Sequence, residues 1–378
     1  MWLYIAGAVS GFGQSIASLN LRYLYDPKNE IDFPMKLINE KSQLTVYFRL
    51  QLRYSQDAIK NYTVSWEKRD SYVQDNGTVL HTGDSLGLSG KISFPVPEKP
   101  WLLVAKVTNT STNKRWFYYQ VMESKYPVDG FLEGEDGIVF ESYVKAGQYV
   151  VRGVRPDKPL HVYFYRTDFS AASPPFADKE SSVDRFLFAD STFSLNNGAK
   201  ALLKSRGLYL VQQDTGAAEG FCFRVVGNAF PKFTKVIEIP APLVFVCTMD
   251  EHNELIAAKD DKAKVDKVIL DITRDTDRAR SFMRNYFRQV ELANLYFSTY
   301  KEGWKTDRGM LYLIFGAPDE VSRTGLNEIW TYKDKIKERF IFLRSGSIYD
   351  PQHYALLRNR RFQENWYNTI DNWRKRGV

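Results

Sequence analysis

The spacing of apolar residues changes once along this chain, near residue 260, and that change limits the folds open to it. Up to about residue 250, apolar and polar residues alternate in short runs separated by turn residues, which is typical of β-strands. From Asp275 to Tyr300, apolar residues recur every three or four positions, as on one face of an α-helix. The pattern predicts a multidomain, mainly β chain that ends in an α+β region.

The β-type part divides into two predicted domains, residues 19–124 and 125–250. Their strand-length runs are separated by turn signals such as Asp75-Asn76-Gly77 and by longer loops such as Ser173-Pro174-Pro175. Strands at this spacing predict a β-sandwich of immunoglobulin or fibronectin type in each domain. An aromatic fraction of 15% supports this reading, because flat rings suit the pleated faces of sheets.

The region 262–378 is predicted to be a small α+β domain. Its first helix is expected over 275–300, with Asp275 or Thr276 as the N-cap. Three strand-like runs follow, and we expect them to pair as an antiparallel meander. These runs are Met310–Phe315, Glu328–Lys333 and Arg339–Arg344. A last helix is expected from about Pro351 to Arg376.

A five-residue segment, Gly-Trp-Lys-Thr-Asp at 303–307, joins the first of these helices to the first strand-like run. Gly303 stands where a helix needs a left-handed residue at its carboxyl end. Trp304 is large enough to anchor the turn to the core, while Thr306 and Asp307 can bond nearby backbone amides and direct the chain into a strand. The segment therefore predicts a structural joint rather than a catalytic loop.

The same region carries a longer series of residues. It reads Gly303-Trp304-Lys305-Thr306-Asp307, then Arg308-Gly-x-x-Tyr-x-x-Phe-Gly316-x-Pro318-Asp319-Glu320, then Glu328-Ile-Trp330-x-Tyr. This series resembles the GWxTD-domain family, which occurs in cell-envelope proteins of certain Gram-negative bacteria, and it is specific over roughly 268–345. The resemblance implies β-rich amino-terminal domains followed by a GWxTD domain. It implies no reaction, because the activity of the family is poorly defined.

Residues 1–14 form an apolar run that ends in small residues near Gly11 and Gly13. The run has the length of a signal-peptide core and is too short to span a bilayer. We expect a cleaved signal peptide and an exported protein of the periplasm or outer membrane. Since the run lacks a positively charged start, an apolar first strand is the alternative. No Cys follows the run, so a lipoprotein anchor is not expected.

Two cysteines, Cys222 and Cys247, lie in apolar, β-like runs. In an exported protein they could form a disulfide that closes a loop of about 25 residues. Two buried free thiols are an equal alternative, because a sequence does not show whether the two Cβ atoms approach. No His stands at ligand spacing from either Cys, so we expect no metal site. No phosphate-binding loop is present, and no cofactor is expected.

Positive charge gathers at the carboxyl end. From Val268 to Val378, 20 Lys and Arg stand against 14 Asp and Glu, although the net charge of the whole chain is only +7. A basic surface can meet nucleic acid, an anionic membrane or an acidic partner. Trp366 and Trp373 lie seven residues apart on the expected core face, so they are not expected to stack on bases. Nucleic acid is therefore not a predicted partner.

Carboxylates are the only enzymatic option in the sequence. Asp307 and Asp319 flank Met310–Phe315, and Glu320 follows them. If that run is a strand, the two aspartates lie about 20 Å apart, which is too far for a carboxylate pair to act on one bond. No nucleophile elbow is present either. We assign no catalytic residue.

We therefore expect a non-enzymatic, exported cell-envelope protein that acts as a scaffold or docking module, with other envelope proteins as partners. A first alternative is a glycan-binding module of a surface polysaccharide system. It would need exposed aromatic residues such as Tyr163 and Tyr165, although packing between sheets is the commoner use of such a pair. A second alternative is an undescribed hydrolase that uses Asp307, Asp319 or Glu320.

Overall fold

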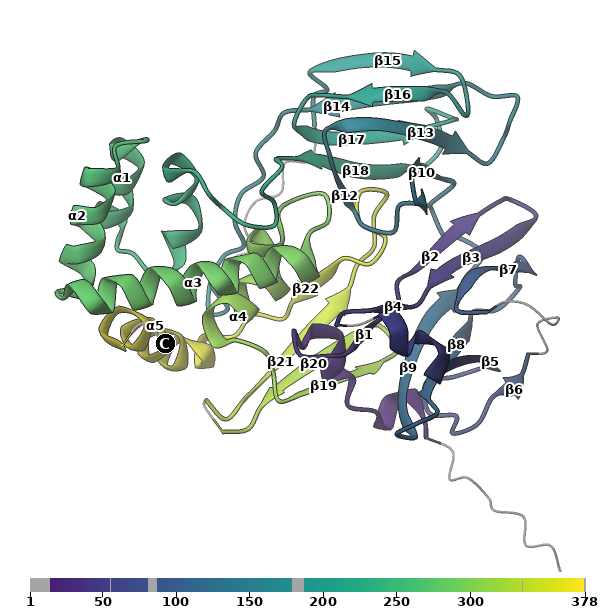
Figure 1. Cartoon of the computed structure of the whole chain (residues 1–378), viewed down its shortest axis with the longest axis horizontal. Helices are drawn as coiled ribbons and strands as arrows, with labels where there is room; N and C mark the ends of the chain where they lie inside the picture. Colours follow the sequence, from purple (N-terminus) through teal and green to yellow (C-terminus); the bar gives the residue numbers. More distant parts are fainter. Residues whose placement is uncertain (1–13, 55, 81–86, 179–186, 335, 377–378) are drawn as a thin grey trace, which may run out of the picture.

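The computed structural model describes residues 14–376 except 55, 81–86, 179–186 and 335. The expected signal peptide therefore lies almost wholly outside the described residues. The chain is multidomain and mainly β, as predicted, with several separate sheets. Figure 1 shows two β-rich regions, one purple to blue and one teal, and a carboxyl-terminal region of green helices and a yellow-green sheet. Among the described helices, none combines the length and apolar character needed to cross a membrane.

The first β region begins after two short 3-10 helices, Ile16–Ser18 and Leu21–Tyr25. Its strands are β1 (Ile31–Asp32), β2 (Met35–Asn39), β3 (Gln43–Arg49), β4 (Gln51–Leu52), β5 (Tyr62–Arg69), β6 (Thr78–Val79), β7 (Ser89–Pro95), β8 (Trp101–Asn109) and β9 (Lys114–Met122). A β2-β3-β7 sheet faces a β6-β5-β8-β9 sheet, and all pairings within them are antiparallel. The rings of Phe48 and Trp66 lie 4.8 Å apart between the two sheets, so their apolar faces form one core.

The second β region has two further sheets. Its strands are β10 (Gly130–Gly134), β11 (Gly137–Ile138), β12 (Tyr143–Lys145), β13 (Gly147–Gly153), β14 (Leu160–Tyr165), β15 (Ser191–Leu195), β16 (Lys200–Leu203), β17 (Gly207–Gln212) and β18 (Phe221–Val226). They are ordered β11-β10-β13-β16 and β12-β18-β17-β14-β15, and the β12–β18 pair is parallel. The apolar cluster of the first β region continues into this one, which joins the two regions through a shared core.

The carboxyl-terminal region mixes helices with one antiparallel sheet. It contains α1 (Met249–Ala258), α2 (Lys262–Thr273), α3 (Thr276–Phe297), α4 (Asp307–Phe315), β19 (Glu320–Thr324), β20 (Asn327–Tyr332), β21 (Glu338–Arg344), β22 (Tyr354–Leu356) and α5 (Gln363–Arg376). The sheet order is β19-β20-β21-β22. Asp275 is the N-cap of α3, as predicted, and its carboxylate accepts from the amides of Asp277 and Arg278. In Figure 1 the sheet lies between these helices and the first β region.

Two predicted elements of this region are wrong. Met310–Phe315 is not a strand but most of helix α4, whose N-cap Thr306 accepts a bond from the Gly309 amide at 3.0 Å. All six residues are buried, so the run has no polar face, and a short, wholly apolar run fits a buried helix as well as a strand. The last helix begins at Gln363 rather than near Pro351, because residues 354–356 form the edge strand β22.

The other two strand-like runs are confirmed. Glu328–Lys333 corresponds to β20 and Arg339–Arg344 to β21, and the two strands pair antiparallel. Trp366 and Trp373 are both buried, as expected for the core face of α5. Residues 16–25 also join this core, although they belong to the start of the chain.

Candidate functional site

Gly303 permits a close approach of two backbone segments, and the left-handed role predicted for it is wrong. It starts a single 3-10 turn, Gly303–Lys305, that packs on α3. A Cβ atom at Gly303 would lie 2.0 Å from the carbonyl oxygen of Ala293. Only a residue without a side chain fits there, so this glycine sets the distance between the turn and α3.

Trp304 anchors the turn, as predicted, because its side chain is only 2% exposed. Its indole N–H donates to Glu302 at 2.9 Å and its ring contacts the edge of Phe245. The backbone amide of Trp304 donates to the side chain of Asn294, which is itself fully buried on α3. The sequence analysis missed Asn294, although an Asn on the apolar face of a predicted helix is a signal of such a bond.

Thr306 and Asp307 start a helix rather than a strand. The Thr306 hydroxyl donates to the Gly303 carbonyl at 2.8 Å, which closes the turn onto itself. The buried carboxylate of Asp307 accepts from the Leu356 amide at 2.8 Å and from the guanidinium of Arg358. Asp307 thereby joins α4 to the edge strand β22, and its negative charge is used to hold these two elements together.

The residues after α4 make a turn, as expected. Gly316 ends the helix with a φ of +78°, and the Tyr332 hydroxyl donates to its carbonyl at 2.9 Å. Pro318 is buried, and Asp319 accepts from the Lys333 amide at 2.7 Å. Asp307 and Asp319 stand at opposite ends of α4, roughly 14 Å of helix apart. The structure does not bring these two carboxylates together.

A buried group of charges lies beside the motif, and the sequence analysis did not identify it. We call Tyr25, Arg308, Arg323 and Glu328 the Glu328 cluster. The Glu328 carboxylate is wholly buried and accepts from Arg323 Nε at 2.6 Å and from the Tyr25 hydroxyl at 2.9 Å. Arg308 Nη1 lies 3.6 Å from Glu328 Oε1, the oxygen that accepts from Tyr25. Trp330, buried at the centre of β20, donates its indole N–H to the same carboxylate at 2.9 Å.

The electrostatics of the Glu328 cluster favour the charged carboxylate. Burial alone would raise the pKa of Glu328, but Arg323 and Arg308 lower it below its ordinary value of 4.5. Burial, together with Glu328, raises the pKa of Tyr25 to about 12, so that its hydroxyl stays protonated and donates. The cluster is a satisfied ionic centre that ties residue 25 to the carboxyl-terminal sheet.

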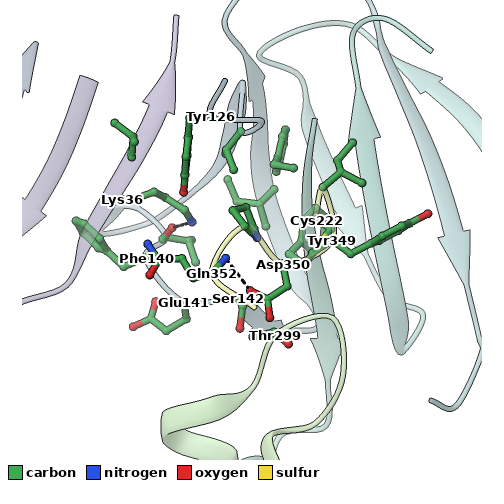
Figure 2. Close-up of a pocket in the computed structure, with 18 of the residues that line it drawn as sticks. Lys36, Tyr126, Phe140, Glu141, Ser142, Cys222, Thr299, Tyr349, Asp350 and Gln352 are labelled. Carbon is green, nitrogen blue, oxygen red and sulfur yellow. Dashed lines mark hydrogen bonds between the residues drawn. The ribbon is translucent and has the colours of Figure 1, made fainter. Parts of the chain in front are cut away.

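A cavity of about 310 Å³ lies where the three regions meet (Figure 2). We call it the junction pocket. Lys36 comes from the first β region, Cys222 from the second and Asp350 from the carboxyl-terminal region. Such junctions between domains are common places for ligand sites.

The polar side chains of the junction pocket already have hydrogen-bond partners within the chain. Lys36 Nζ donates to the Val139 carbonyl at 2.5 Å, and burial lowers the pKa of its ammonium to about 8. The Cys222 thiol donates to the Tyr349 carbonyl at 2.7 Å, and burial raises its pKa, which makes it a poor nucleophile. Asp350 accepts from the Gln352 amide at 3.1 Å. The pocket is therefore lined by an ammonium and a thiol that serve contacts between the regions, and by a carboxylate that bonds within its own region.

Both cysteines are free thiols in this structure. Cys222 lies in β18, as the pattern suggested. Cys247 follows the 3-10 helix Ala241–Phe245, so the β-like reading of its run is wrong. Burial raises the pKa of Cys247 to about 12. Across the described residues, no group of three His, Cys, Asp or Glu side chains could hold a metal ion.

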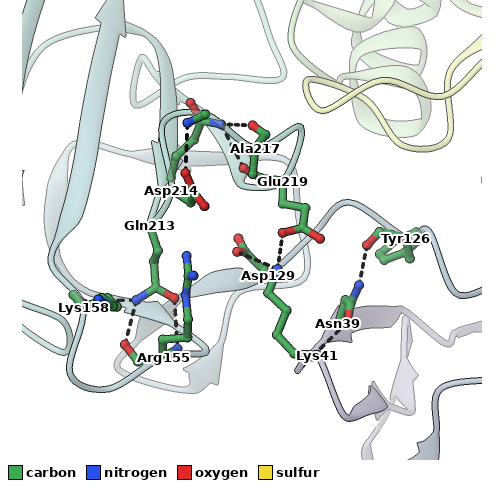
Figure 3. Close-up of polar contacts among 12 residues, drawn as sticks. Asn39, Lys41, Tyr126, Asp129, Arg155, Lys158, Gln213, Asp214, Ala217 and Glu219 are labelled. Carbon is green, nitrogen blue, oxygen red and sulfur yellow. Dashed lines mark hydrogen bonds and ion pairs between the residues drawn. The ribbon is translucent and has the colours of Figure 1, made fainter.

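The two β regions are also joined by polar contacts, in which Asn39 and Asp129 are buried (Figure 3). The Asn39 amide donates to the Val128 carbonyl at 2.7 Å, and its side chain donates to the Tyr126 carbonyl at 2.9 Å. Lys41 pairs with Glu219 and lies 3.7 Å from Asp129. We call these three charged residues the Lys41 joint. Burial raises the pKa of Asp129, and Lys41 opposes that rise.

Tyr163 and Tyr165, the aromatic pair considered for glycan binding, have different surroundings in the structure. Tyr165 is only 4% exposed and packs edge-on against Tyr349 of the carboxyl-terminal region. Tyr163 is half-buried on β14. Tyr165 therefore serves the contact between regions and offers no open face for a sugar ring.

Comparisons with known proteins place the family signal in the second half of the chain. A family model described as the GWxTD domain matches residues 207–375. No curated protein matches the chain. Among solved structures, the crystal structure of the S-layer protein SbsC, domains 7, 8 and 9, is 9% identical and covers 51% of this chain and 59% of its own. Its TM-score of 0.15 is too low to support an argument about fold. The match over β17 to α5 shows that residues 207–375 of the chain carry a GWxTD domain.

Proposed function

We propose that this protein is a non-enzymatic, exported scaffold of the cell envelope, in which the GWxTD domain holds two β-sandwich domains of immunoglobulin or fibronectin type and docks other envelope proteins. The envelope proteins in which the family occurs and the apolar run at residues 1–14 support export. The observation that carries the scaffold role is the Glu328 cluster. It fixes the amino-terminal segment to the carboxyl-terminal sheet through buried, charge-assisted bonds.

The bonding of the signature residues supports a scaffold over a hydrolase. Trp304 and Thr306 complete the turn, Asp307 holds Arg358, and Trp330 bonds Glu328. A general acid or base needs a proton-transfer partner in reach of substrate. Asp307 instead has its two oxygens engaged by backbone and guanidinium groups in the interior.

Cross-linking in intact cells tests the scaffold role. The full-length tagged chain is cross-linked, purified under denaturing conditions, and its attached proteins are identified by mass spectrometry. We expect a defined set of envelope proteins with the natural chain, and loss of that set with Glu328→Gln, which loosens the attachment of the regions. Recovery of the natural chain alone would end the proposal.

Fractionation of the same cells tests export separately. We expect the protein in the periplasmic or outer-membrane fraction. Its recovery with cytoplasmic markers would contradict the location without affecting the cross-linking result.

A further inference from the structure

A second cavity, of about 610 Å³, lies between α3 and α5, away from the junction pocket. Carboxamide side chains dominate its polar lining, so we call it the amide groove. They come from both helices and comprise Asn285, Gln289, Asn365, Asn368 and Asn372. Ile314 and Phe315 at the end of α4, and Gly316 directly after it, also line the groove. In Figure 1, α5 runs beneath α3.

The carboxamides have a regular spacing. Asn285 and Gln289 are four residues apart on α3, and Asn368 and Asn372 are four apart on α5. Each pair therefore lies on one helix face with a separation of about 6 Å along the axis. An extended peptide repeats every two residues, at about 6.6 Å. The rows thus match the spacing of successive peptide groups on one edge of an extended chain.

Carboxamides also match a peptide group in chemistry. Each offers an N–H donor and a carbonyl acceptor, so that it can bond both groups of a peptide unit whatever the side chains are. Asn365 is already in use, because it donates to the Ile336 carbonyl at 3.2 Å and to Glu338. Asn368 and Asn372 are exposed, and the described residues provide no side-chain partner for either.

Gln289 gives a second, independent sign of a missing ligand. Its side-chain oxygen is buried and accepts no hydrogen bond from the described residues. Leaving such an acceptor unpaired costs free energy, and a donor from a bound chain would recover it. The unsatisfied atom belongs to the same groove as the two free carboxamides of α5.

The remaining lining narrows the ligand class. Trp373 is buried and donates its indole N–H to the Ile314 carbonyl at 3.0 Å, so it presents no open ring on which a sugar could stack. Arg288 and Arg376 are the charged residues of the lining. Arg288 pairs with Glu291 at 2.8 Å, so Arg376 is the cation left for a ligand, and the described lining contains no carboxylate. The groove is therefore suited to an extended chain with acidic rather than basic side chains.

We propose that the amide groove binds an extended, acidic segment of a partner protein through its backbone. This inference rests on the proposed docking function and gives that function a surface. Gln289 bonds one edge of the segment, and Asn368 and Asn372 bond the other. Arg376 attracts its acidic side chains. Backbone recognition of this kind gives affinity, while the flanking charges select the partner.

A displayed library of linear peptides of about twelve residues, selected on the full-length chain, tests the proposal. Selected peptides are synthesised and their dissociation constants measured by fluorescence anisotropy. We expect acidic sequences whose affinity falls by at least about tenfold with Asn368→Ala/Asn372→Ala. Asn76→Ala, an exposed Asn in a turn of the first β region, is the matched control and leaves affinity unchanged. Methylation of alternate peptide nitrogens also weakens binding.

Two results would overturn the groove. One is a set of peptides that bind the double variant as well as the natural chain, or no peptide tighter than about 1 mM. The other is binding of soluble dextran oligosaccharides that the double variant loses. Cross-linking in cells separates this failure from failure of the scaffold. If the double variant keeps every partner of the natural chain, the groove is wrong and the scaffold stands. If peptides bind but the natural chain has no cellular partner, the scaffold role is wrong.

Discussion

The Glu328 cluster and the Lys41 joint both pair charges between distant parts of the chain, but they do so in different surroundings. Glu328 is fully buried, and the side chains of Arg308 and Arg323 are only 13% and 15% exposed. Lys41 and Glu219 are each 36% exposed. The first pairing is wholly withdrawn from water. In the second, Lys41 and Glu219 are partly solvated and only Asp129, 3% exposed, is buried, so the loss of the two pairings should differ in cost.

The two groups of charges have different roles: one attaches the amino-terminal segment, and the other aligns the two β regions. Removing one partner of a buried ion pair leaves an uncompensated charge in the interior, whereas an exposed pair is replaced by water. The amino-terminal segment is therefore locked to the carboxyl-terminal sheet. The two β regions depend on their shared apolar core, and the Lys41 joint adds only a preference for one alignment. Four experiments can break or sharpen this contrast.

Glu328→Gln should have the largest effect, because it leaves Arg308 and Arg323 without a carboxylate in the interior. We expect a loss of about 3–5 kcal/mol in the free energy of unfolding, measured by urea denaturation. The natural chain should also weaken in acid. The pKa of Glu328 is below 4.5 in the folded state, so its stabilisation is complete above that pH and is lost as the pH falls below it. Glu328→Gln should flatten that acid dependence, and an unchanged profile would contradict the cluster.

Trp304→Ala should cost about 3–5 kcal/mol, because a large buried ring is lost next to α3. Urea unfolding followed by tryptophan fluorescence and by circular dichroism would show whether the turn unfolds together with the sheet. Trp304→Phe, which keeps most of the volume, should recover much of the loss. A fully stable Trp304→Ala protein that no longer binds its cellular partners would show that the turn is a contact surface.

Lys36 in the junction pocket gives an intermediate effect that depends on pH. Its pKa is about 8 in the folded state against 10.5 for an ordinary Lys. Between these values the unfolded chain binds more protons, so stability rises with pH. From about pH 7.5 to about pH 9.5 we expect a gain of about 2 kcal/mol that Lys36→Met lacks. Lys301, whose pKa is also lowered to about 8, is unchanged in both proteins and cancels in the difference. If the unfolding free energies of the natural chain and of Lys36→Met depend equally on pH, the ammonium of Lys36 is exposed to water and the prediction is wrong.

Lys41→Ala should have the smallest effect, because Lys41 and Glu219 are each 36% exposed and only Asp129, 3% exposed, is left in the interior without its ammonium. We expect a change of less than about 1 kcal/mol in unfolding free energy. The pair should also weaken with salt, so the difference from the natural chain should shrink when salt is added. A loss as large as that of Glu328→Gln would remove the contrast between the two fastenings.

Local signals in the sequence predicted much of the fold and of the motif. The change in apolar spacing located the β-rich and helical parts, and Asp275 and Trp304 have the roles expected of them. The family signature was also correct, because it depends on residue order alone. These features are encoded within a few neighbouring residues.

The features that the sequence did not reveal depend on distant contacts. Met310–Phe315 was misread because burial on every side removes the periodicity that separates helix from strand. Gly303 was misread because the atom that excludes a side chain belongs to Ala293, ten residues earlier on another element. Nothing in the local sequence links Tyr25 to Glu328, and the junction pocket combines three regions. The carboxamide pairs on α3 and α5 could have been noticed as repeats of four, but their shared groove could not.

The position of Tyr25 in the core has a consequence for the order in which parts of the chain can fold during synthesis. Tyr25 and Glu328 are 303 residues apart, so a growing chain presents the first long before the second exists. Contacts of such separation form late and slowly. The family match at 207–375 also excludes Tyr25, so an isolated GWxTD segment would lack a member of its own core. A shortened product of synthesis would keep residues 16–25 unburied and open to chaperones or proteases. The core of the carboxyl-terminal region can therefore be completed only in a chain that contains both residues 16–25 and the carboxyl-terminal sheet.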